Sequence, residues 1–247
     1  MKSIKNMYLL SNRVALYNEV LCLLGLGSMS ETKRADEYSD MDFFLVVKNG
    51  SKDRFLYQLD WLEIHPILFT FKNSNDGNKV LFSDGTFAEY AVFTEDEILN
   101  ATYTKGKIYY QKETYLENIS DCKNIKFKKP IDISYHVNET LSNLYIGLKR
   151  EKRGEYASAT TFIQSYAYQL VVQLFPYCFE NTIEFEDYFV YERRIEFHFK
   201  EAKSIISNMR QGYLKNKESA LEILNFLIKY FNPNEFIVKE IKDMIHS

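Results

Sequence analysis

A glycine-serine pair and two alternate aspartates stand between two apolar runs in the N-terminal part of the chain. Gly27 and Ser28 follow the first run, and Asp40 and Asp42 enter the second, which ends at Val47. Successive side chains of a strand point to opposite faces, so Asp40 and Asp42 share a face. Two neighbouring carboxylates repel each other and are costly to desolvate unless a cation lies between them. The pattern predicts a Mg²⁺ ion held by oxygen ligands and presented to phosphates.

The residues around this pair suit a nucleoside triphosphate. Gly27 can adopt backbone angles closed to other residues, so a sharp turn there lets a phosphate approach the main chain. Ser28 and the amides after Gly27 are candidate ligands of the β- and γ-phosphates. Lys33 and Arg34 lie in the intervening loop. They either neutralise a leaving pyrophosphate or are ordinary loop charges.

A third carboxylate is expected from a later strand. Glu89 is the single charged residue in the apolar run 86–93. A lone carboxylate inside such a strand needs a cation or a donor as its partner. Glu89 could bind a second Mg²⁺ that orients an acceptor hydroxyl. Alternatively, it could act as the general base, with a pKa that its apolar surroundings and neighbouring carboxylates raise toward the working pH. The alternative is a charge that protects a sheet edge from aggregation.

The elements that position these residues follow from apolar spacing. In the N-terminal half, we expect helices over 4–17 and 53–64. Strands are expected over 20–26, 41–47, 65–71, 80–82, 86–93 and 107–111, with a hairpin turn over 73–78. A polar, Lys-rich linker is expected over 118–130. The predicted domains are residues 1–125, which carry the candidate site, and residues 126–247.

The second half has helical periodicity throughout. Helices are expected over 134–153, 155–175, 191–212, 217–230 and 234–245, which together predict a helical bundle. Tyr156, Tyr166 and Tyr168 on its second helix either line an acceptor pocket or pack within the bundle. The fold class is therefore α+β, a mixed sheet with flanking helices followed by a helical bundle.

Composition limits the classes of function. The chain has 247 residues, 46% hydrophobic and 26% charged, as in ordinary globular proteins. Its net charge of −3 argues against a nucleic-acid binder, which would carry a basic face. Its three cysteines are widely spaced, which favours a reducing compartment over a disulfide framework or zinc site. No apolar run reaches ~18 residues, the length that a membrane span needs. We therefore expect a cytoplasmic protein without a membrane segment.

The combination of Gly27-Ser28, Asp40-x-Asp42 and Glu89 resembles the signature of the nucleotidyltransferase superfamily with the polymerase-β-like core. The stretch GSMSETKRADEYSDMDFFLVV, with His65-Pro66 and the strand that carries Glu89, looks closer to the lincosamide nucleotidyltransferases of bacteria. The similarity covers roughly the first hundred residues and is thinner in the helical half. It implies an N-terminal catalytic domain, a C-terminal helical domain for substrate binding and dimerisation, Mg²⁺ dependence with two ions, and often a homodimer.

The resemblance implies transfer of a nucleoside monophosphate, AMP from ATP, to a hydroxyl of a small molecule such as a lincosamide or aminoglycoside antibiotic. Asp40, Asp42 and Glu89 would be the catalytic and metal-binding residues, and Gly27, Ser28, Lys33 and Arg34 the nucleotide-binding ones. Two alternatives stay open at this point. The enzyme could modify protein hydroxyls or RNA ends, or the chain could be an inactive nucleotide-binding relative.

Overall fold

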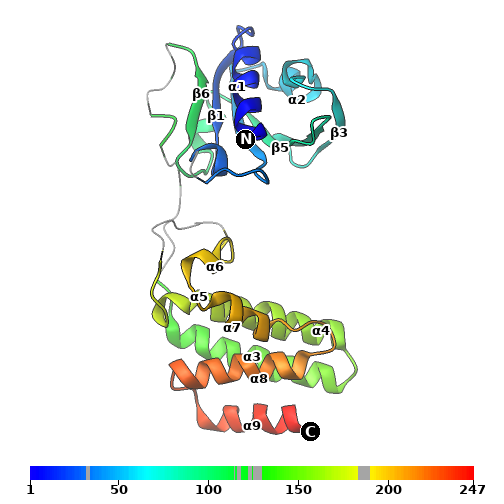
Figure 1. The fold of residues 1–247 in the computed structure, drawn as a ribbon, viewed down its shortest axis with the longest axis vertical. Coiled ribbons are helices and arrows are strands. Elements are labelled where there is room, and N and C mark those ends of the chain that lie inside the picture. Colours follow the sequence, from blue (N-terminus) through cyan, green and yellow to red (C-terminus); the bar gives the residue numbers. More distant parts are fainter. Residues whose placement is uncertain (32–33, 114, 116–117, 122–123, 125–129, 183–189) are drawn as a thin grey trace. The chain divides into compact units, whose positions relative to one another are not determined.

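The computed structural model describes residues 1–31, 34–113, 115, 118–121, 124, 130–182 and 190–247. The chain divides into two compact units, Met1–Lys126 and Phe127–Ser247 (Figure 1). Each unit has a hydrophobic core of its own, and each is described by itself. The first is built around a sheet and the second from helices.

The first unit contains a six-stranded mixed sheet of order β3-β4-β5-β2-β1-β6. Its strands are β1 (Val20–Gly25), β2 (Met41–Val47), β3 (Ile67–Lys72), β4 (Gly77–Phe82), β5 (Phe87–Thr94) and β6 (Lys107–Gln111). The pair β2 and β5 is parallel, and the other paired strands are antiparallel. The predicted α+β class and the strand over 41–47 are confirmed.

The two faces of the sheet are covered differently. One face packs on α1 (Lys2–Val14) and α2 (Lys52–Tyr57), and strand residues such as Phe43 and Tyr90 enter that core with Trp61. On the other face, Cys22, Leu24 and Val46 pack against Ile98, Tyr103 and Ile119. Strand alternation explains the division, because Phe43 and its neighbour Phe44 point to opposite faces.

Several bounds predicted for the first unit are wrong. The helix expected over 4–17 ends at Val14, and the strand expected over 80–82 begins at Gly77. The helix expected over 53–64 ends at Tyr57, and a 3-10 turn, η2 (Asp60–Leu62), follows it. The buried Trp61 explains the break, because its ring Nε1 donates back to the carbonyl of Phe55 at 2.9 Å. The linker expected from residue 118 begins later, since Ile119 is buried and accepts a hydrogen bond from Tyr103. Residues 122–123 and 125–129 of that linker lie outside the described part of the chain.

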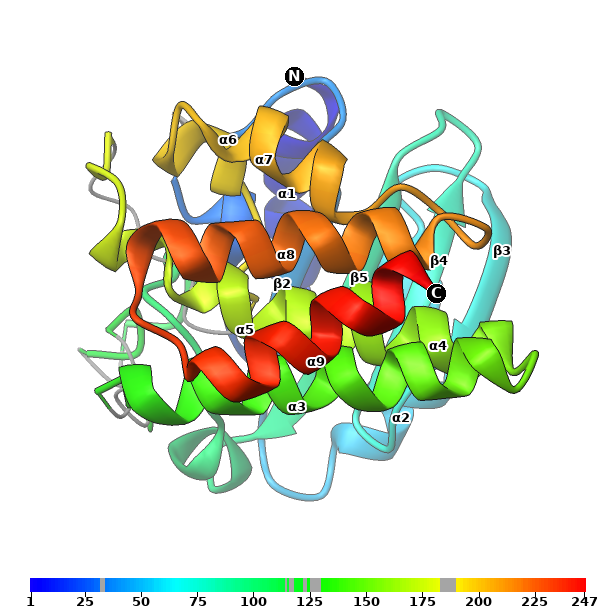
Figure 2. The same ribbon diagram turned by 90° about the horizontal axis from the view of Figure 1, so that it is seen from below.

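The second unit is helical, as predicted. Its described helices are α3 (Ile133–Lys152), α4 (Tyr156–Thr161), the π-helix η4 (Phe162–Ala167), α5 (Tyr168–Gln173), the 3-10 helix η5 (Phe175–Tyr177), α6 (Ile195–His198), α7 (Ala202–Met209), α8 (Asn216–Tyr230) and α9 (Glu235–His246). Figure 2 shows α3, α8 and α9 side by side. Of the described helices, none is both long and apolar enough to cross a membrane.

The helix expected over 191–212 is instead two short helices, α6 and α7. Phe199 interrupts them in an extended conformation and places its ring 5.8 Å from that of Phe175 in the core. The three tyrosines of the predicted second bundle helix differ in their exposure to solvent. Tyr168 is buried in the core, whereas Tyr156 and Tyr166 are exposed.

Candidate active site at one end of the sheet

Four side chains form a line across four neighbouring strands. Asp42 on β2 is the register partner of Glu89 on β5. Glu89 is in turn paired with Lys79 on β4, and Lys79 is paired with Phe71 on β3. Register partners on adjacent strands point to the same face of a sheet. We call Asp42, Glu89, Lys79 and Phe71 the cross-strand row. It lies on the face opposite α1, where Glu89 and Phe71 are exposed.

Glu89 is held by two groups from the hairpin of β3 and β4. Its Oε1 accepts a hydrogen bond from Nδ2 of Asn73 at 2.8 Å, and its Oε2 lies 3.1 Å from Nζ of Lys79. The lone carboxylate therefore has both the donor and the cation that its position demands. Each oxygen of the carboxylate therefore has one partner from the hairpin.

Asp40 lies within electrostatic reach of Glu89. Partial burial, together with the negative charge of Glu89, raises the pKa of the Asp40 carboxyl, and Lys79 acts in the opposite direction. The predicted proximity of Asp40, Asp42 and Glu89 thus has two supports. One is the register of Asp42 with Glu89, and the other is the interaction of Asp40 with Glu89.

Gly27 lies directly against Asp42. Its φ of +53° is in the region that favours glycine, and a Cβ placed there would lie 3.3 Å from Oδ2 of Asp42. The preceding amide, of Leu26, donates to the carbonyl of Asp42 at 2.8 Å. Only a residue without a side chain leaves the space above this carboxylate clear. The sharp turn predicted at Gly27, after β1, is therefore present, and it lies next to the side chain of Asp42.

The other predicted nucleotide-binding residues lie on the segment that follows. Ser28 is half-buried in the 3-10 turn η1 (Gly27–Met29). Arg34 is largely buried, and its Nε lies 3.9 Å from Oε2 of Glu31. Lys33 lies outside the described residues. Their role at a nucleotide stays a prediction.

The donor chemistry of this end of the sheet fits Mg²⁺. Among the described residues, no three His, Cys, Asp or Glu side chains are grouped closely enough to form a protein cage for a metal ion. Mg²⁺ does not require such a cage, because it commonly binds one or two carboxylates together with water and substrate phosphates. Asp40 and Asp42 offer two oxygen donors of that kind, and the charge of Glu89 beside Asp40 favours a cation there.

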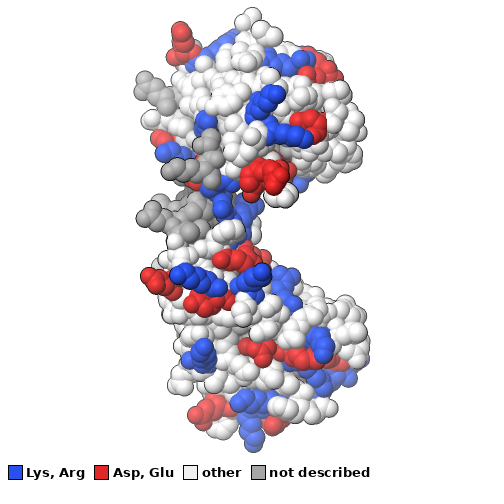
Figure 3. All heavy atoms as spheres, in the orientation of Figure 1, with Lys and Arg blue, Asp and Glu red and all other residues white. Residues whose placement is uncertain are grey.

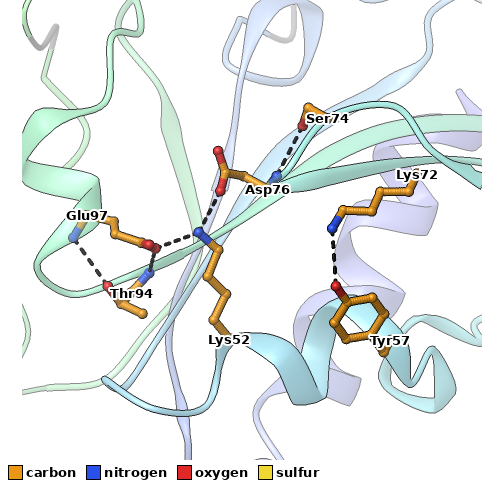
Figure 4. Close-up of polar contacts among 7 residues, drawn as sticks. All are labelled: Lys52, Tyr57, Lys72, Ser74, Asp76, Thr94 and Glu97. Carbon is orange, nitrogen blue, oxygen red and sulfur yellow. Dashed lines mark hydrogen bonds and ion pairs between the residues drawn. The ribbon is translucent and has the colours of Figure 1, made fainter.

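An ion-pair cluster fixes the hairpin that holds Glu89. Nζ of Lys52, at the start of α2, lies 2.6 Å from Oδ1 of Asp76 and 2.8 Å from Oε2 of Glu97 (Figure 4). Asp76 belongs to the turn between β3 and β4, and its carbonyl accepts from the amide of Val92 at 2.7 Å. The turn that carries Asn73 is thereby tied to both α2 and β5.

Sequence reasoning did not identify Asn73, Lys79 or Lys52. The turn residues before Gly77 indicated a hairpin, but the partner of Glu89 depends on its register, and a slip of one residue would turn Lys79 to the opposite face. Acidic and basic side chains are interspersed over each unit on the face seen in Figure 3, so charge clustering gave no signal either.

Comparison with known proteins gives distant similarities only. No protein-family model matches the chain, and no curated sequence matches it. Among solved structures, it is similar to an aminoglycoside 6-adenyltransferase from Bacillus subtilis, with 15% identity, 97% of this chain and 90% of the other covered, and a TM-score of 0.38.

Two further solved structures show similarity over most of this chain. One is a nucleotidyltransferase-like protein from Exiguobacterium sibiricum, at 11% identity, 92% and 74% coverage and a TM-score of 0.33. The other is a spectinomycin adenyltransferase from Enterococcus faecialis, solved with ATP and spectinomycin, at 11% identity, 100% and 99% coverage and a TM-score of 0.31.

Proposed function

We propose that the chain is a Mg²⁺-dependent nucleotidyltransferase that moves AMP from ATP to a hydroxyl of a small molecule and releases pyrophosphate. The observation that carries the proposal is the alignment of Asp42 with Glu89, with the Gly27 turn against Asp42. A carboxylate pair beside a phosphate-accessible turn is what transfer from a triphosphate requires.

The residues have separate tasks in this reaction. Asp40 and Asp42 would hold Mg²⁺, which when bound supplies the positive charge that stabilises the α-phosphate during attack. Ser28 and the amides after Gly27 bind the β- and γ-phosphates. Lys33 and Arg34, from the loop before β2, neutralise the pyrophosphate as it leaves.

Glu89 acts on the acceptor. The acceptor oxygen forms a bond to the α-phosphorus, the bond from that phosphorus to the bridging oxygen breaks, and the hydroxyl proton passes to Glu89 as general base. Asn73 donates to one oxygen of the Glu89 carboxylate and Lys79 pairs with the other, so these two residues hold the carboxylate in place. If Glu89 instead binds a second Mg²⁺, the same two residues limit how far it can move.

The acceptor that we propose is an antibiotic-like molecule with free hydroxyls, from the lincosamide or aminoglycoside class. The helical unit would contribute to acceptor binding and to a homodimer, and the enzyme would act in the cytoplasm. These details rest on the resemblance in sequence and are open to direct test.

The test is a mass-spectrometric screen. The full-length chain is incubated with ATP and Mg²⁺ and a panel of lincosamides, aminoglycosides, proteins and tRNA, and products are searched for the addition of one AMP. We expect one class of small molecule to gain AMP, and we expect Asp42→Asn and Asp40→Asn to abolish the product. Labelling of protein or RNA with no modified drug would overturn the small-molecule assignment. Transfer that survives Asp42→Asn would overturn the mechanism.

A further inference from the structure

A second line of side chains runs beside the cross-strand row, and it is apolar. Phe69 on β3 is the register partner of Leu81 on β4, and Leu81 that of Phe87 on β5. Phe69 and Phe71 are 51% and 46% exposed, and their ring centroids lie 5.6 Å apart. We call Phe69, Phe71, Leu81 and Phe87 the apolar platform.

Three members of the platform, Phe69, Phe71 and Leu81, lie on β3 and β4, on the side of Glu89 that faces away from the phosphate turn; Phe87 lies on β5 itself, two residues before Glu89. In the sheet, β1 with its exit at Gly27 is on one side of β2, and β5, β4 and β3 follow on the other. A triphosphate bound at Gly27 and Asp42 therefore leaves the strands beyond Glu89 to the acceptor. Strands lie ~4.8 Å apart, so Phe71 stands about 10 Å from Glu89 along the row.

Lys79 stands between the reacting carboxylate and the exposed rings. Its ammonium pairs with Glu89 and is only partly exposed. Because the ammonium of Lys79 and the carboxylate of Glu89 together carry no net charge, the apolar rings beyond them are the feature that would select an acceptor. Exposed aromatic faces bind flat apolar surfaces, including the ring faces of sugars and aromatic groups.

From these positions we propose that the apolar platform is the acceptor subsite, and that the acceptor is a hydroxylated molecule with an apolar ring about 10 Å from its reacting hydroxyl. The assignment rests on the proposed function, since it takes Glu89 as the group that faces the acceptor hydroxyl.

The test compares two glycosides that differ only in the apolar ring. Dissociation constants of a phenyl glycoside and the matching methyl glycoside are measured by NMR titration of the full chain with Mg²⁺ and a non-hydrolysable ATP analogue. The wild-type chain should bind the phenyl glycoside at least fivefold more tightly. Phe71→Ala and Phe69→Ala should each remove that preference.

Leu68→Ala is the matched control. Leu68 is exposed on the same strand but lies at the register shift between β3 and β4, outside the paired positions that form the platform. It should keep the preference. Equal binding of the two glycosides by the wild-type chain, or a preference that survives Phe71→Ala, would overturn the proposal. The proposal would also be overturned if Phe71→Ala altered the oligomeric state and left glycoside binding unchanged, since the rings would then form a contact between protein copies.

The readout separates this proposal from the proposed function. AMP transfer that depends on Asp42, in a chain without any phenyl preference, would overturn the acceptor subsite alone. A phenyl preference that requires Phe71, in a chain that never transfers AMP, would overturn the proposed reaction and leave a ring-binding surface.

Discussion

The face of the sheet opposite α1 has two ends that differ in kind, although β2 and β5 contribute to both. Toward the end of β2, Val46 is fully buried with Ile98 and Tyr103. Four residues earlier on the same face, Asp42 belongs to a row whose members Glu89 and Phe71 are exposed. We call the end at Val46 the covered end and the end at Asp42 and Glu89 the open end.

The difference shows where charge is tolerated on a strand. A carboxylate at the position of Val46 would lose its hydration without a partner, at a cost of several kcal/mol, on the order of the desolvation penalties of buried ions. At the open end, Glu89 keeps contact with solvent and has Asn73 and Lys79 as partners. The covered end thus serves stability and the open end is available for chemistry.

The largest expected effect separates the two ends by activity. Glu89→Gln should lower AMP transfer by about 10²- to 10⁴-fold, the usual cost of losing a general base. The free energy of unfolding should change by less than about 1 kcal/mol, because the residue is exposed and glutamine still accepts from Asn73. Steady-state rates and urea unfolding measure the two quantities. Undiminished transfer would leave Glu89 as an exposed partner of Asn73 and Lys79 with no catalytic role; its strand β5 is paired on both sides, so it is not an edge charge either.

The covered end should respond in the opposite sense. Leu24→Ala removes a fully buried side chain from the cluster with Ile98 and Tyr103 and should cost about 2 to 5 kcal/mol of unfolding free energy. Chemical denaturation provides the value. Below the unfolding transition, the KM for ATP should stay within about twofold of the wild-type value. A large change in KM with normal stability would mean that the two ends are not separable.

Gly27→Ala tests the turn against Asp42. A positive φ costs a non-glycine residue about 1 to 2 kcal/mol, and the new Cβ would also press on Oδ2 of Asp42 from 3.3 Å. Gly50→Ala is the control, since Gly50 also has a positive φ but its Cβ would meet nothing within 4 Å. Both variants should lose similar stability, and Gly27→Ala alone should lose at least about tenfold in transfer rate. Equal rates in the two variants would remove Gly27 from the site.

The smallest effect concerns the support of the hairpin. Lys52→Met removes the ammonium between Asp76 and Glu97 and should cost about 1 kcal/mol, since both carboxylates are partly exposed. Lys72→Met is the control, because the Lys72 ammonium donates to the exposed hydroxyl of Tyr57 at 3.2 Å. Figure 4 shows this contact apart from the Lys52 cluster. The rate of AMP transfer should fall by about a few fold in Lys52→Met, because a slightly displaced Asn73 would hold Glu89 less well. No difference between the two variants would show that the cluster does not support the site.

The sequence could predict what depends on local pattern. Alternation of apolar residues predicted β2 and β5, and the lone charge in β5 singled out Glu89. The alternate spacing of Asp40 and Asp42 also predicted that their side chains share a face. These features need no knowledge of which strands become neighbours.

Features that depend on pairing could not be predicted in this way. The cross-strand row exists because β4 pairs with β5 in one register, and nothing local to Lys79 or Phe71 indicates it. The end of α2 at Tyr57 and the break at Phe199 also follow from tertiary packing, since buried aromatic rings override helical periodicity at both places.

The most direct test of the open end as a nucleotide site is the Mg²⁺ dependence of ATP binding. Calorimetry on the full chain should give ATP binding that requires Mg²⁺ and that falls at least about tenfold in Asp42→Asn, a loss of about 1.4 kcal/mol or more. Asp53→Asn, on the exposed first turn of α2, should bind as the wild-type chain does. ATP binding that is equal with and without Mg²⁺, and unchanged by Asp42→Asn, would contradict the account.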